Sequence, residues 1–147
     1  MLLLAGCADK KTDSERFSEE FNVSEENTAK YLKDIDEVVY QLNHGIHVVL
    51  IASGDEKTNL QVKDLVETLR SYPGMVIYYY EFTKMTVKDF EAVKESVPYL
   101  NIQQTNPILM FVKEGETVEC LNSWDVTVLK EQLDNINKDV KPGCDDC

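Results

Sequence analysis

The sequence predicts an α/β domain of three layers, in which helices flank a central mixed sheet of four to five strands. Apolar runs typical of strands alternate with segments whose apolar residues recur at helical spacing, in the order β-α-β-α-β-α-β-β-α. Strands separated by helices pair in parallel through right-handed crossovers, whereas the tight turn at Glu114 and Gly115 makes the last pair antiparallel. The 147 residues, 43% of them hydrophobic, suffice for one domain, which we expect over residues 21–140.

The first half of this domain is expected to hold a short strand, a helix, a buried strand and a second helix. Residues 21–23 are the short strand, and Ser24 caps a helix whose first turn carries Glu25 and Glu26, which complement the helix dipole. The apolar run I-H-V-V-L-I-A at residues 46–52 is typical of a strand covered on both faces. The inward faces are Tyr31, Ile35, Val38, Val39 and Leu42 in the first helix, and Val62, Leu65, Val66 and Leu69 in the second.

The second half continues with a strand at residues 75–82, rich in valine, isoleucine and tyrosine. Thr86 and Asp89 form a capping box that opens the next helix. Residues 107–113 and 117–123 are expected to form a hairpin, and residues 126–140 the final helix. The inward faces of these helices are Val87, Phe90, Val93 and Val97, and then Val128, Leu129, Leu133 and Ile136.

The N-terminus suggests a lipid anchor. Residues 1–7 read M-L-L-L-A-G-C, and L-A-G-C matches a bacterial lipobox, in which the thiol of Cys7 takes the lipid. Few residues precede Cys7 and none is basic, so the alternatives are a truncated signal or an accidental apolar start. We expect an extracytoplasmic, membrane-anchored lipoprotein of a bacterium. Residues 8–20 are polar, with Phe17 as the one large apolar side chain, and are expected to form a flexible tether.

The charge disfavours several function classes. The formal net charge of -12 repels phosphate backbones, so we expect no nucleic-acid partner. The sequence has no glycine-rich phosphate loop, no Ser-His-Asp set and no zinc-ligand spacing. We therefore expect no cofactor and no metal.

The most specific motif is T-N-P-I-L-M-F-V-K-E-G-E at residues 105–116, in which a proline leads directly into an apolar strand. Proline cannot donate to a β-ladder and is tolerated at the first position of a strand. With the element order and the run at residues 46–52, this motif resembles the thioredoxin fold over residues 21–140. The resemblance implies that the Asn106–Pro107 peptide bond is cis and that Pro107 faces the functional site.

The thiol centre that the resemblance implies has no counterpart in the sequence. In redox-active members a Cys-x-x-C opens the helix after the first central strand, where the helix N-terminus stabilises the thiolate. The corresponding residues are 57–60, K-T-N-L, and the sequence holds no cysteine between Cys7 and Cys120. The buried acid of some members falls near Ile51, which transfers no proton. We expect the usual redox centre to be absent.

Two interpretations of the proline motif stay open. In the fold family the backbone beside the cis proline pairs with a bound peptide, which implies a groove for an extended peptide or envelope protein. The residues assigned to it are Ser53, Gly54, Lys57, Asn106 and Pro107. The other interpretation is a proline that supports the fold and binds nothing.

The C-terminal segment, residues 141–147, ends in a second cysteine motif, C-D-D-C, at Cys144 and Cys147. These thiols could form a disulfide outside the cytoplasm, although adjacent carboxylates disfavour the thiolate. Three thiols including Cys120 are weak evidence for a metal site, and Cys120 is expected to be a small hydrophobe. The expected function is binding or assembly at the membrane; the alternative is a thiol–disulfide oxidoreductase or isomerase that uses Cys144 and Cys147.

Overall fold

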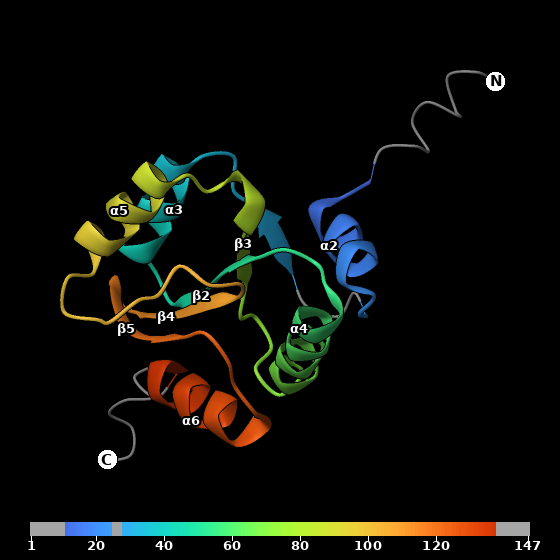
Figure 1. Cartoon of the computed structure of the whole chain (residues 1–147). Coiled ribbons are helices and arrows are strands. Elements are labelled where there is room, and N and C mark those ends of the chain that lie inside the picture. Colours follow the sequence, from blue (N-terminus) through green and yellow to red (C-terminus); the bar gives the residue numbers. More distant parts are fainter. Residues whose placement is uncertain (1–10, 25–27, 138–147) are drawn as a thin grey trace, which may run out of the picture.

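The apolar runs form a mixed sheet of five strands in the order β1-β3-β2-β4-β5 (Figure 1). The computed structural model describes residues 11–24 and 28–137. Strands β1, β3 and β2 are parallel, β4 is antiparallel to β2, and β5 is antiparallel to β4. The predicted class and the terminal hairpin are confirmed. The strands are β1 (Ala29–Tyr31), β2 (His47–Ala52), β3 (Ile77–Glu81), β4 (Ile108–Lys113) and β5 (Glu116–Leu121).

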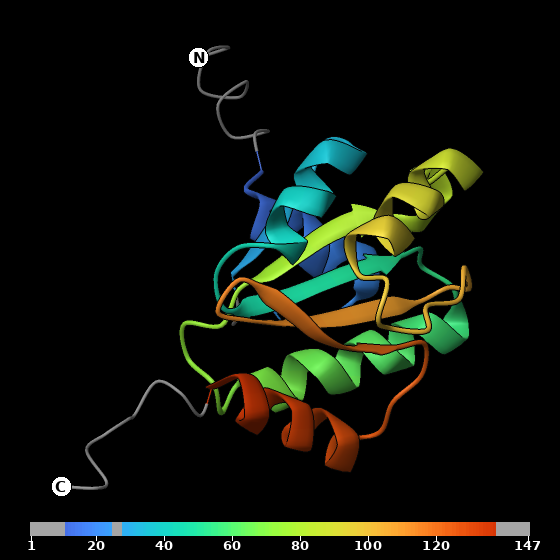
Figure 2. The ribbon, with the colours of Figure 1, turned by 90° about the vertical axis from the view of Figure 1, so that its left-hand side faces the viewer.

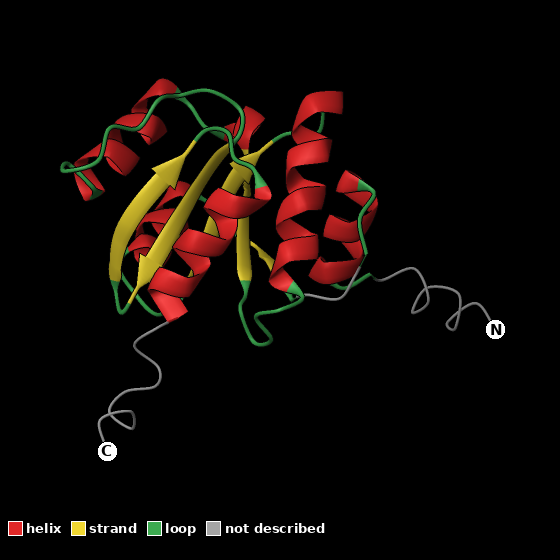
Figure 3. Cartoon of the chain, turned by 90° about the horizontal axis from the view of Figure 1, so that it is seen from below, coloured by secondary structure: helices red, strands yellow, loops and turns green. Residues whose placement is uncertain are grey.

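Helices cover both faces of the sheet, and Figure 2 shows them as layers above and below the strands. Helices α3 (Ile35–Leu42) and α5 (Val87–Ser96) pack on one face, and α4 (Glu56–Leu69) and α6 (Val126–Asn137) on the other. Figure 3 shows the same arrangement from below. A short 3-10 helix, η1 (Phe82–Lys84), follows β3.

Strand β2 lies in the middle and is buried along its whole length. Val48 and Leu50 belong to the core cluster beneath α4 and α6, whereas Val49 and Ile51 belong to the cluster beneath α3 and α5. A strand with both faces covered favours apolar residues, which explains the unbroken apolar run at residues 48–52. His47 at the start of the strand is buried with its Nε2 2.8 Å from the Gln41 carbonyl oxygen.

Two predicted local features are confirmed, namely the cap of one helix and the turn of the hairpin. Thr86 and Asp89 form a capping box at the start of α5, where each side chain accepts the main-chain N–H of the other residue. Glu114 and Gly115 have φ angles of 47° and 83°, the left-handed conformation that tight hairpins use. One assignment in α5 is wrong, because Val87 at its first position is exposed rather than inward.

The expected tether is wrong over most of its length. Helix α2 (Asp13–Phe21) replaces it, and the part of residues 8–20 that precedes Lys11 lies outside the described residues. Thr12 and Glu15 form a capping box, and Phe17 and Phe21 are only 3% and 1% exposed. These two rings are four residues apart and lie on one helical face, so burying them holds the helix against the sheet.

The beginning of the predicted domain also differs. Residues 21–23 are not a strand, because α2 runs to Phe21 and ends at Asn22, whose φ is 56°. The first strand is β1, which contains Tyr31, and the helix expected from Ser24 instead begins at Ile35 behind the N-cap Asp34. Glu25 and Glu26 lie outside the described residues. The Asp34 carboxylate accepts the Glu37 N–H at 3.0 Å and so caps this helix.

Candidate functional site

The loop between β2 and α4 meets the loop before β4. The Asn106–Pro107 peptide bond is cis, as the proline motif predicts. Ile51 pairs with Ile108 in the antiparallel β2–β4 ladder, and this register brings Ser53 beside Asn106. The structure thus brings together the predicted residues from two segments about fifty positions apart in the sequence.

The side chain of Asn106 ties these loops together. Its Oδ1 accepts the main-chain N–H of Ser53 at 3.0 Å, and its Nδ2 donates to the Ser53 carbonyl at 3.0 Å and to Asp55 Oδ2 at 3.1 Å. The main-chain N–H and C=O of Asn106 hydrogen-bond to no described residue. The side chain therefore has a structural role, and the main chain is the part that could pair with a ligand.

Asp55 occupies the N-cap of α4. Its Oδ1 accepts the Thr58 N–H at 2.8 Å, which satisfies one of the main-chain donors of the first turn. Hydrogen bonds from Thr58, with a further one from Asn106, hold the pKa of the Asp55 carboxyl below its ordinary value. The N-terminus of α4 thus already carries an anionic group that belongs to the chain.

Comparison with known proteins places this architecture. No protein-family model matches the chain, and no curated protein matches it. A solved structure of a designed protein is similar over 79% of this chain and 94% of its own, with a TM-score of 0.56 and 20% identity. Reduced thioredoxin pre-protein from Schistosoma mansoni is similar over 75% of this chain and 99% of its own, with a TM-score of 0.51 and 16% identity. The chain has a thioredoxin-like fold. At these identities the likeness shows the fold alone.

The segment that corresponds to the Cys-x-x-C of redox-active members opens α4 two residues earlier than predicted. Helix α4 begins at Glu56 behind Asp55, so residues 57–60 lie inside its first turn and residues 55–58, D-E-K-T, open it. Neither set contains a cysteine. Ile51, predicted to stand where some members of the fold have a buried acid, is fully buried and pairs with Ile108.

The other predicted site residues lie at the rim of this loop. Gly54 and Lys57 are exposed, and Lys57 is in the first turn of α4. A Cβ on Gly54 would lie 3.4 Å from Asn59 Oδ1 and 3.6 Å from the Glu20 carbonyl oxygen, so the end of α2 borders the loop. Ser53 Oγ and Asn59 Oδ1 are buried and have no hydrogen-bond partner among the described residues.

Sequence reasoning missed Asp55 and the contact with α2. Asp55 could have been found, because an aspartate three residues before a threonine at the start of a helical pattern is a capping signal. The nearness of Glu20 to the loop had no local signal, because it depends on how α2 packs.

The cysteines divide into one described residue and three others. Cys120 lies in β5, and burial, with a smaller contribution from Glu119, raises the pKa of its thiol to about 12. Cys7, Cys144 and Cys147 lie outside the described residues. Within residues 11–24 and 28–137, no cluster of metal-ligating side chains is found, and no helix is long and apolar enough to cross a membrane.

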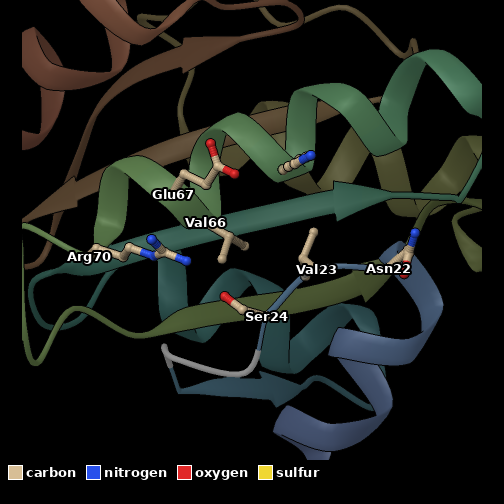
Figure 4. Close-up of a pocket in the computed structure, with 7 residues that line it drawn as sticks. Asn22, Val23, Ser24, Val66, Glu67 and Arg70 are labelled. Atoms are coloured by element: carbon tan, nitrogen blue, oxygen red, sulfur yellow. The ribbon is translucent and has the colours of Figure 1, made fainter.

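A hollow with a volume of about 180 Å³ lies between the end of α2 and α4, apart from the cis-proline loop (Figure 4). Asn22, Val23 and Ser24 form one wall, and Val66 and Glu67 of α4 with its C-cap Arg70 form the other. Its charged groups, Lys63, Glu67 and Arg70, have both signs. We assign no role to this hollow.

Proposed function

We propose that this chain is a binding or assembly module, held at the outer surface of a bacterial membrane by a lipid on Cys7, with a thioredoxin-like fold and no thiol redox centre at the usual place. The observation that carries the proposal is Asp55 at the N-cap of α4, held by Thr58 and Asn106. A thiolate is stabilised by a helix N-terminus, and here a carboxylate without redox chemistry takes that place.

The proposed ligand is an extended peptide segment of an envelope protein. The main-chain N–H and C=O of Asn106 have no partner among the described residues, and a peptide strand needs one acceptor and one donor at such a position. Ser53, Gly54 and Lys57 border this position and Pro107 follows it, so they would contact the side chains of the peptide.

Site-specific cross-linking tests the binding site. A photoreactive amino acid at Lys57, in the complete protein in its native host, should trap a discrete partner. The matched control is Lys88, which is also exposed and also the second residue of its helix, on α5. If both positions trap the same proteins to the same extent, the assigned site is wrong.

A variant at Asn106 then separates binding from folding. Asn106→Asp replaces the donor that faces Asp55 Oδ2 at 3.1 Å with a second carboxylate oxygen, so the two loops repel each other. We expect the affinity for the trapped partner to fall about tenfold, which corresponds to about 1.4 kcal/mol. Unchanged affinity in a folded variant would mean that the partner does not bind at the loops that the Asn106 side chain holds together.

The anchor has its own test. L-A-G-C followed by a polar segment motivates lipidation of Cys7. Expressed from its complete gene, the protein should partition with membranes, and Cys7→Ser should release it or block its processing. Mass spectrometry that finds an unmodified Cys7 in the native protein would refute the anchor and leave the binding proposal intact.

The second candidate function is thiol–disulfide exchange through Cys144 and Cys147, which the C-D-D-C motif favours. Exchange requires a thiolate and an oriented attack, and the two aspartates between these cysteines disfavour the thiolate. We expect only trace reduction of a model disulfide such as insulin, lost in the double variant Cys144→Ser, Cys147→Ser. Turnover typical of an active thioredoxin that disappears in the double variant would make this pair the active site.

A further inference from the structure

A groove of about 370 Å³ lies beside the short edge strand β1, away from the cis-proline loop. Its walls come from the start of α2, from β1 and from α3, and Tyr78 of β3 contributes to it. Three tyrosines and two carboxylates line it, a combination that suits an organic cation because aromatic faces and carboxylates both attract positive charge.

Two residues of the groove already contact a cation of the chain itself. The Arg16 guanidinium lies 4.2 Å from the centroid of the Tyr31 ring, and its Nη1 is 3.5 Å from Asp13 Oδ1. Tyr31 and Asp13 both line the groove. A tyrosine ring and a carboxylate of the groove therefore bind a guanidinium.

Helix α3 supplies the same pair of groups to this groove. Glu37 and Tyr40 are three residues apart on α3, which places them on one face of the helix, and both line the groove. Glu37 Oε1 accepts the Lys33 N–H at 2.7 Å, while its second oxygen and the Tyr40 hydroxyl bond to no described residue. Tyr40 is 56% exposed and stacks on His44 at 3.8 Å, and no described lysine or arginine lies over its ring.

We propose that Glu37 and Tyr40 bind a lysine or arginine side chain of a basic partner protein in this groove. The carboxylate pairs with the charge and the ring packs against its apolar stem. The formal net charge of -12 favours encounter with such a partner. Lys30 also lines the groove, and its charge opposes the ligand. The proposal uses no residue of the cis-proline site, so the two stand or fall separately.

The test is an NMR titration of the full-length protein, labelled with ¹⁵N, with the blocked peptide Gly-Arg-Gly-Arg-Gly. The matched probe is Gly-Glu-Gly-Glu-Gly. We expect the arginine peptide to shift the amide signals of Glu37, Tyr40 and Gln41 most strongly, and the glutamate peptide to leave them in place. Added salt should weaken the binding.

Four variants make the test directional. Tyr40→Leu and Glu37→Gln should each weaken binding about two- to fivefold. Lys30→Gln should strengthen it about twofold, because a like charge is removed. Tyr99→Leu is the control, since Tyr99 is also 56% exposed but lies outside the groove. Spectra of the free variants establish that each is folded.

Several outcomes would overturn the proposal. One is equal binding of the glutamate peptide, and another is weaker binding after Lys30→Gln, which would mean that the groove prefers an anion. A third is a set of shifts spread over surface carboxylates without a maximum on α3, which would mean non-specific attraction to an acidic protein.

Discussion

The two edges of the sheet are protected in different ways. At one edge, β1 has three residues and α2 covers its outer side: the Ser14 hydroxyl accepts the Ala29 N–H at 3.0 Å, and Asp13 Oδ2 accepts the Tyr31 N–H at 3.0 Å. At the other edge, β5 has six residues, and its neighbour in the sheet is β4 alone.

The β5 edge depends on side chains that tie its two ends. Thr117 Oγ1 donates to the Leu42 carbonyl at 2.7 Å, and Asn122 Nδ2 lies 3.1–3.2 Å from the carbonyls of Gln103, Thr105 and Pro107. A register shift, the mark of a β-bulge, interrupts its ladder with β4, and bulges discourage edge pairing. The difference shows that the short edge strand takes hydrogen-bond partners from a helix, whereas the longer one combines its ladder with side-chain ties at its two ends.

The largest expected effect comes from a substitution in α2, the helix that covers the β1 edge. Phe21→Ala should lower the free energy of unfolding by about 3–5 kcal/mol, because the Phe21 ring is buried against Tyr79, with their centroids 5.4 Å apart. Urea denaturation measures the loss. Leu60→Ala, at a side chain 64% exposed on α4, is the control and should change stability by less than about 0.5 kcal/mol. Equal small effects would mean that α2 is the tether that its polarity suggested.

The failure to predict α2 has a physical explanation. Residues 8–20 look like a tether because Phe17 is their one large apolar residue, but its partner Phe21 lies just beyond that boundary. Read together with Thr12 and Glu15, the pair gives a capping box followed by an i, i+4 apolar pair, which predicts a helix. Local signals were therefore present, and a boundary drawn on average polarity divided them.

The site was predictable in part. Pro107 and the strand after it identify the cis-proline loop, and the run at residues 46–52 locates the loop at Ser53, since both are local patterns. The use of the Asn106 side chain was not predictable, because it depends on the register between β2 and β4. The groove beside β1 likewise depends on three elements that meet only in the fold.

The second prediction concerns the polar contact under α2. The Tyr79 hydroxyl lies 2.6 Å from Glu20 Oε2 and 2.9 Å from the Ala52 carbonyl, and Tyr79 is fully buried. Tyr79→Phe should cost about 1–3 kcal/mol, because the two acceptors lose the one buried hydroxyl hydrogen that lies between them. Tyr31→Phe removes an exposed bond to the same carboxylate and should cost less. An equal cost for both would place the effect in Glu20 rather than in burial.

The Tyr79 contact also predicts a dependence on pH. Burial, with Glu20 second, raises the pKa of Tyr79 above its ordinary value, so the folded state keeps a proton that the unfolded state releases. Stability should therefore fall as the pH rises above about 10, the ordinary tyrosine value. Tyr79→Phe should make this fall less steep. An unchanged slope would show that other groups cause the alkaline loss.

The third prediction tests the side-chain ties of the β5 edge. Thr117→Val keeps the shape of a buried side chain but removes the donor to the Leu42 carbonyl, and we expect a loss of about 1–2 kcal/mol in urea denaturation. The control is Thr127→Val, at an exposed position of α6, which makes the same substitution without removing a buried hydrogen bond. A loss no larger than that of the control would mean that the ladder alone holds β5.

The fourth prediction weakens the cover of β1 without touching its apolar contacts. Ser14→Ala removes the acceptor of the Ala29 N–H and should cost about 0.5–1.5 kcal/mol. Amide hydrogen exchange at Ala29 should accelerate, while exchange at the central strand β2 stays slow. Ser71→Ala, at an exposed turn, is the control. Unchanged exchange at Ala29 would show that α2 protects this edge by packing and not by its hydroxyl.

The smallest expected effect concerns Cys120 in the edge strand β5. Burial raises the pKa of this thiol to about 12, whereas an unfolded cysteine has a pKa of about 8.5. In a variant with Cys7, Cys144 and Cys147 changed to serine, Cys120 should react slowly with a thiol reagent at pH 8 and rapidly in urea. Because the unfolded state releases its proton first, stability should fall by under about 1 kcal/mol between pH 7 and pH 9, and Cys120→Ala should remove that loss. Rapid reaction in the folded protein would instead mean that β5 opens readily, and that its ladder and side-chain ties protect this edge less well than α2 protects β1.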